Sequence, residues 1–328
     1  MRVNTPAELP ARTFGPVPSR RFGQSLGLNT IPPKTCSYSC VYCQVGRTTR
    51  MPKERAVFYH PDDIFRDVRG RLAQARGTSE RVDYLTFVPD GEPTLDSNLG
   101  REISLLKGLG VPVGVITNSS LIWREDVREE LGQADWVSLK VDAVQEALWR
   151  RVDRPQNALR LPAILDGMLA FAKAFTGQLV TETMVVNGLN DAEAGLREVA
   201  DFLRLLRPSR AYLGVPTRPP AEEGVRGPDE GSLNRAYQIL TGRVKRVELL
   251  TGYEGNAFAS TGAVDKDLLS ITAVHPMREE AIRALLARAG SPWEAVERMV
   301  GQGDLVKTEY EGRTFYMRRL AKDREAAA

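Results

Sequence analysis

Short apolar runs alternate with longer amphipathic stretches between about residue 22 and residue 216. β-Branched and aromatic residues fill the short runs, as is typical of buried strands. The pattern predicts six strands, at residues 22–30, 82–88, 111–117, 136–141, 179–185 and 211–215. Repeated strand–helix units predict an α/β fold around a parallel sheet. Six units are too few for a closed eightfold barrel, so we expect a partial (βα)6 TIM-type barrel.

Helix and hairpin signals mark two further parts of the chain. Pro61-Asp62-Asp63 predicts a helix start, since proline and acidic residues favour a first turn, and this helix should stop near Gly77. After residue 275 the pattern predicts two helices, at 277–289 and 292–301, and then a hairpin around Glu311-Gly312. We therefore expect a basic N-terminal extension (1–21), a partial barrel (22–260) and a small winged-helix-like domain (275–320).

Polar residues follow the predicted strands. They are Cys36–Cys43 after the first strand, Asp90-Gly91-Glu92-Pro93 after the second, Asn118 after the third, Lys140 and Asp142 at the end of the fourth, Asn187-Gly188 after the fifth and Thr217-Arg218 after the sixth. Carboxyl ends of parallel strands open on one face, so these segments should converge there. The stretch 218–231, rich in Pro, Gly and Glu, predicts a long loop that is either a lid or plain surface.

Composition narrows the class of protein. Hydrophobic residues make up 42% and charged residues 27%, which is ordinary for a folded chain. No apolar run is long enough to span a bilayer and no export signal is evident, so we expect a cytoplasmic protein without membrane contact. Residues 1–55 carry nine Lys or Arg against two acids, a net charge of +7, which favours an anionic neighbour.

All three cysteines lie within eight residues, at Cys36, Cys40 and Cys43. They cannot form an internally paired disulfide framework, so metal binding is the natural interpretation. A structural zinc ion needs a fourth protein ligand, and the two histidines, His60 and His275, lie 17 and 232 residues beyond Cys43. An iron–sulfur cluster normally takes four thiolates, so three imply an iron open to another ligand. A zinc site completed by His60 is the alternative.

The Cys-x-x-x-Cys-x-aromatic-Cys loop, with Tyr42 before its last cysteine, resembles the signature of the radical S-adenosylmethionine (radical SAM) superfamily. Gly91-Glu92-Pro93 is similar to the family's glycine–glutamate motif, with Asp90 in place of the commoner first glycine. The segment from Phe14 to Arg21 resembles a subgroup of iron–sulfur oxidoreductases related to wyosine-base synthases.

This resemblance implies a [4Fe-4S] cluster held by the three cysteines and S-adenosylmethionine bound at the open iron. An external donor of the flavodoxin or ferredoxin kind would supply an electron, and the resulting 5′-deoxyadenosyl radical would abstract hydrogen from a substrate. The cofactor contacts that it implies are Tyr42, Gly91, Glu92, Pro93, Asn118, Ser138 and Lys140. For Asn118 the alternative is a turn residue bonding its own backbone, and for Lys140 a solvated cation.

Two substrate classes follow. RNA, tRNA in particular, fits the basic first 55 residues, with Arg20, Arg21, Arg47 and Arg50 as phosphate contacts. A peptide or protein substrate, docked by the C-terminal domain, is the second hypothesis, because residues 276–328 carry ten Lys or Arg and nine acids, a net charge of only +1. The non-enzyme alternative is a zinc-stapled nucleic-acid-binding protein.

Overall fold

A curled, open sheet forms the centre of the molecule. The computed structural model describes residues 12–52, 54–252 and 255–319. The strands, in spatial as well as chain order, are β1 (Thr13–Ser19), β2 (Gly23–Leu28), β3 (Tyr84–Phe87), β4 (Val113–Thr117), β5 (Trp136–Lys140), β6 (Gln178–Met184), β7 (Arg210–Gly214) and β8 (Val247–Leu250). Strands β2 to β8 are parallel, and β1 runs antiparallel to β2. The predicted partial TIM-type barrel is confirmed.

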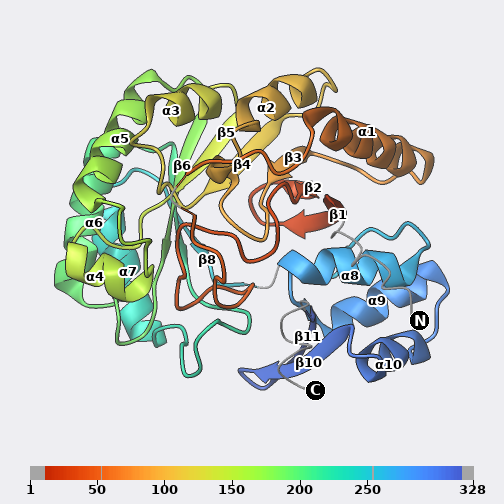
Figure 1. Cartoon of the computed structure of the whole chain (residues 1–328). Helices are drawn as coiled ribbons and strands as arrows, with labels where there is room; N and C mark the ends of the chain where they lie inside the picture. Colours follow the sequence, from red (N-terminus) through yellow and green to blue (C-terminus); the bar gives the residue numbers. More distant parts are fainter. Residues whose placement is uncertain (1–11, 53, 253–254, 320–328) are drawn as a thin grey trace, which may run out of the picture.

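Helices cover the outer side of this sheet in an arc (Figure 1). They are α1 (Pro61–Gly77), α2 (Leu99–Lys107), α3 (Glu125–Leu131), α4 (Glu146–Val152), α5 (Leu161–Ala174), α6 (Glu193–Leu206) and α7 (Glu230–Thr241). Helix α1 begins at the predicted proline, and its N-cap residue His60 accepts a hydrogen bond from the backbone N–H of Asp62 at Nδ1. Each βα crossover buries one helix face against the sheet. Side chains that act on a ligand are therefore expected on the loops that follow the strands.

All six predicted strands are present, but two more lie at the edges of the sheet. Strand β1 contains Pro16 and Pro18 and has an irregular register between Phe14 and Val17. Proline is tolerated at a sheet edge because no neighbour there needs its missing N–H. Strand β8 is only four residues long, with two exposed central positions. The segment predicted as an N-terminal extension therefore contributes a strand from residue 13 onward.

The C-terminal unit lies beside β1 and β2 (Figure 1). It consists of α8 (Val264–Val274), β9 (Met277–Arg278), α9 (Glu279–Ala289), α10 (Glu294–Gly301), β10 (Leu305–Tyr310) and β11 (Arg313–Arg318). The three strands pair in the order β10-β11-β9. The two helices and the hairpin follow the predicted pattern, whereas α8 and β9 add to it. Phe14 and Val17 of β1 belong to the same apolar cluster as α8 and α9.

No helix in the described ranges has the length and apolar character needed to cross a membrane.

Candidate active site

The three cysteines lie on the long loop between β2 and α1. A backbone hydrogen bond of 3.0 Å from the N–H of Cys36 to the carbonyl of Arg50 closes the base of this loop. Two successive turns then follow, because the N–H of Cys43 donates to the carbonyl of Cys40 and the N–H of Gly46 to that of Cys43. The three thiols are free and half-buried. Local turns, set by the close spacing, thus present all three sulfurs from one short segment.

Burial dominates the chemistry of these thiols. It raises the pKa of Cys36 to about 12, with the charge of Glu92 as the next cause. Burial also raises the pKa of Cys40 well above its usual value, followed by the charges of Asp153 and Cys43. The pKa of Cys43 is raised by burial too, although backbone N–H groups and Lys140 oppose the rise. A thiol with a raised pKa holds little thiolate near neutral pH, so the sulfurs are poor free nucleophiles.

Gly91 brings the loop after β3 into contact with the cysteine loop. The N–H of Lys34 donates to the carbonyl of Asp90 (3.1 Å), and the N–H of Glu92 donates to that of Thr35 (3.4 Å). A Cβ atom on Gly91 would lie only 1.8 Å from the carbonyl oxygen of Thr35. Only glycine fits here, because any side chain would force the two loops apart.

The Glu92 carboxylate is buried and accepts hydrogen bonds from three residues. Oε1 accepts from the backbone N–H (3.0 Å) and the hydroxyl (2.6 Å) of Thr94, and from the hydroxyl of Thr117 (2.5 Å). Oε2 accepts from the backbone N–H of Asn118 at 2.7 Å. Burial raises the pKa of Glu92, and these donors oppose the rise. Glu92 therefore ties the ends of β3 and β4 together.

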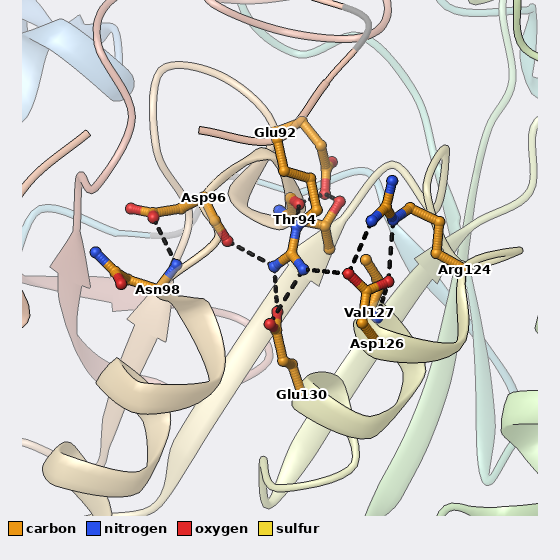
Figure 2. Close-up of polar contacts among 9 residues, drawn as sticks. Glu92, Thr94, Asp96, Asn98, Arg124, Asp126, Val127 and Glu130 are labelled. Atoms are coloured by element: carbon orange, nitrogen blue, oxygen red, sulfur yellow. Dashed lines mark hydrogen bonds and ion pairs between the residues drawn. The ribbon is translucent and has the colours of Figure 1, made fainter. Parts of the chain in front are cut away.

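A buried arginine supports the Glu92 loop from behind. Arg55, which follows the cysteine loop, donates to the backbone carbonyls of Thr94 (2.9 Å) and Asp96 (2.7 Å). It also forms ion pairs with Asp126 and Glu130 of α3. Figure 2 shows these acidic side chains turned toward the turn that carries Thr94 and Asp96. The cluster fixes the short 3₁₀ turn Pro93–Leu95, which begins at the predicted Pro93.

Asn118 contacts Cys36 directly, and Tyr42 is connected to Cys40 through Asp153. The Asn118 amide Nδ2 lies 3.4 Å from Cys36 Sγ and 3.0 Å from Ser37 Oγ. The Tyr42 hydroxyl donates to Asp142 and lies 3.3 Å from Asp153 Oδ1. The Cys40 thiol lies 3.4 Å from the same Asp153 oxygen. Burial and then the charge of Asp142 raise the pKa of Asp153 well above its usual value.

Lys140 and Ser138 lie on neighbouring inward positions of β5. The Lys140 ammonium is 4.9 Å from the centre of the Tyr42 ring. Burial lowers its pKa, but the surrounding acids, led by Asp142 and Glu182, raise it overall. The Ser138 hydroxyl donates to Glu182 at 3.0 Å, and Glu182 also forms an ion pair with Arg21. Burial opposes ionisation of Glu182, yet Arg21 and Lys140 lower its pKa.

Asp153 and Glu182 were not predicted as site residues. Asp153 follows α4, and Glu182 lies in β6, where its neighbours on the same face, Val180 and Met184, are apolar. A lone acid in an apolar strand is the signal that could have pointed to Glu182, because an unpaired buried charge is costly. Asp153 offered no comparable signal.

A small cavity of about 80 Å³ lies between the barrel interior and the C-terminal unit. Its wall includes Ser25, Thr86 and Ile116 from the strands, Gln44 from the cysteine loop, and Arg218 and His275 from the opposite side. Gln44 Nε2 donates to the carbonyl of Val274 (2.7 Å), and Arg218 donates to Gln44 Oε1 (2.7 Å). The residue after the third cysteine therefore connects to the end of α8.

The predicted loop at 218–231 packs on the cysteine loop. The N–H of Glu222 donates to the carbonyl of Val41, and its carboxylate pairs with Arg47 and Arg154. Of the arginines predicted to contact phosphates, Arg21 and Arg47 thus bind carboxylates of this chain. Arg50 is exposed and Arg20 is half-buried. His60 is exposed at the start of α1, where its Nδ1 lies 3.6 Å from Asp62.

Comparison with known proteins shows the family of the chain. The model of the radical SAM superfamily matches residues 30–203. UPF0026 protein MJ1312 of Methanocaldococcus jannaschii is 46% identical over 309 residues, covering 94% of this chain and 96% of the relative.

Solved structures show the same fold. A radical SAM methyltransferase from Sphaerobacter thermophilus superposes with a TM-score of 0.55 at 17% identity, over 69% of this chain and 66% of that one. A structure of TYW1 superposes with a TM-score of 0.49 at 16% identity, over 68% of this chain and 76% of that one. The chain belongs to the radical SAM superfamily and is an enzyme of that type.

Proposed function

We propose that Cys36, Cys40 and Cys43 hold a [4Fe-4S] cluster whose open iron binds S-adenosylmethionine. The observation that carries this proposal is a set of three half-buried thiols within eight residues of one loop, in a chain with no fourth cysteine. When bound, the reduced cluster supplies the electron that cleaves S-adenosylmethionine to methionine and a 5′-deoxyadenosyl radical.

The donor set fits a cluster better than a single metal ion. Across the residues that the structure describes, no three His, Cys, Asp or Glu side chains lie close enough together to bind one ion. A cube of iron and sulfide spaces its thiolate ligands further apart than a tetrahedral zinc ion does. The exposed position of His60 on α1 gives no support to the zinc alternative.

The residues around the thiols would orient the cofactor and exclude water. Gly91 and Glu92 set the distance between two loops, while Tyr42 packs against Lys140 and shares Asp153 with Cys40. Gln44, the residue after the third cysteine, lines one side of the 80 Å³ cavity together with Val274 and His275. A primary alkyl radical reacts with almost any hydrogen donor, so such enclosure is what the chemistry requires of the protein.

For the substrate, the contacts support a polypeptide over RNA. The groove between the 218–231 loop and the β10–β11 hairpin is about 640 Å³ in volume. Its described lining includes Glu223, Glu309 and Glu311, the Glu222 carboxylate that Arg47 and Arg154 already pair with, and Arg226 as its single cation. Such a surface repels a phosphate backbone. Arg21 and Arg47 are already paired with acids of this chain.

Anaerobic reconstitution tests the proposal. We expect iron and sulfide at about four each per chain. With a chemical reductant replacing a flavodoxin or ferredoxin donor, mass spectrometry should detect 5′-deoxyadenosine. Cys40→Ala should abolish the product, and His60→Ala should retain it. One zinc per chain without iron, lost in His60→Ala, would establish the zinc alternative.

Peptide and tRNA pools added in parallel should separate the substrate classes, since only a true substrate acquires a modification.

A further inference from the structure

The side chain of Asn118 is fully engaged within the protein. Asn118 directly follows β4. The next residue, Ser119, has a left-handed φ of 67°, which turns the chain sharply. Asn118 Oδ1 accepts from the backbone N–H of Ser120 at 2.9 Å. Nδ2 has two hydrogens, and it lies within donating distance of Cys36 Sγ and Ser37 Oγ. The amide therefore has a partner for its acceptor and for both of its donors.

The orientation of this amide follows from its neighbours. If O and N were exchanged, Nδ2 would face the backbone N–H of Ser120, and two donors would oppose each other. The backbone of Asn118 is held as well, because its N–H donates to Glu92 Oε2 at 2.7 Å. Ser37 Oγ is in turn 2.5 Å from Ser120 Oγ, and both serines are buried. These hydrogen bonds hold the Asn118 amide so that one of its Nδ2–H groups points at Cys36 Sγ.

We infer that Asn118 is a positioning residue that holds Cys36 and raises the reduction potential of the cluster through an N–H···S hydrogen bond. The inference rests on the proposed function, and it differs from the cofactor contact that the family resemblance implied for Asn118. Reduction adds negative charge to the cluster and its thiolates. A donor that points at one of these sulfurs stabilises the reduced state more than the oxidised state, so it raises the potential.

Potentiometric titration of the reconstituted full chain, followed by electron paramagnetic resonance, tests this inference. Asn118→Ala removes the donor and should shift the potential to a more negative value. Asn118→Asp preserves the size and the acceptor for Ser120 but places a carboxylate near the sulfur, so its potential should fall at least as far. Asn234→Ala, an exposed asparagine on α7, is the matched control and should keep the wild-type potential.

Affinity for S-adenosylmethionine, measured by equilibrium dialysis on the same samples, distinguishes a positioning residue from a residue that contacts the cofactor directly. For a positioning residue, Asn118→Ala should change the Kd by less than about threefold. An unchanged potential with a Kd weakened about tenfold or more would overturn the inference in favour of a direct cofactor contact. A wild-type protein that assembles no cluster would instead refute the proposed function itself. If Asn118→Ala does not fold, the Asp variant decides by the same comparison.

Discussion

Glu102 of α2 is a buried acid outside the active site whose carboxylate has no hydrogen-bond partner among the described residues. Its side chain is 1% exposed. Burial, followed by the charges of Asp96 and Glu130, raises its pKa to about 9. The folded protein therefore binds a proton that the unfolded chain releases near its ordinary value of 4.5.

The sign of the pH dependence follows from this difference. Between about pH 4.5 and pH 9 the folded state holds more protons, so the free energy of unfolding falls as the pH rises. Glu102→Gln is neutral at every pH and should be more stable than wild type at pH 8, by about 2–4 kcal/mol. The gain should shrink toward pH 5. Thermal melts at both pH values check this, with exposed Glu129→Gln as a control that shows no such trend.

At the scale of elements, the site depends on contact between the loops after β2 and β3. The two loops meet through backbone groups at Asp90, Glu92 and Thr35, with Gly91 between them. The cysteine loop contains no helix or strand, and the loop after β3 contains only the short 3₁₀ turn Pro93–Leu95, so the contact between the loops sets their separation. The close approach of the two loops therefore requires a residue without a side chain at position 91.

Gly91→Ala should separate the loops, because its Cβ would overlap the Thr35 carbonyl at 1.8 Å. We expect a loss of about 1–3 kcal/mol in unfolding free energy and reduced iron content after reconstitution. Gly70→Ala, in the middle of α1 with no atom within 4 Å of the new Cβ, is the matched control and should bind iron normally. Equal iron content in the two variants would show that the loop contact is dispensable.

At the scale of the whole molecule, the C-terminal unit shares a core with the barrel. Phe14, Val17 and Phe258 join residues of α8, α9 and α10 in one apolar cluster. Arg288 of α9 donates to the carbonyl of Phe258, and the N–H of Ala259 donates to that of Pro16. Together with the Gln44 contact, this packing makes the unit a fixed cap on one side of the barrel.

Leu268→Ala should therefore destabilise the entire chain. Leu268 of α8 is fully buried in the shared cluster, and removing its side chain should cost about 2–5 kcal/mol. Far-ultraviolet circular dichroism should show one transition at a lower Tm. Two separate transitions, with the barrel melting as in wild type, would mean that the units unfold independently. Leu249→Ala, at an exposed position of β8, should change the Tm little.

Local pattern alone determined the cysteine loop, the six central strands and the family resemblance. Each is a property of neighbouring residues: thiol spacing, runs of β-branched side chains, and a short motif after a strand. The same reasoning missed β1, because Pro16 and Pro18 argue against a strand unless its position at the sheet edge is known. It also missed β8, which is short and half-exposed.

Only the tertiary structure decided what the site residues contact. Asn118 meets Cys36 across 82 residues, and Arg21 meets Glu182 across 161. Pairings over such distances depend on how the strands line up in the sheet, which no local spacing encodes. The sequence therefore indicated which segments hold the candidate site residues, and the packing of the barrel determined which of these residues contact one another.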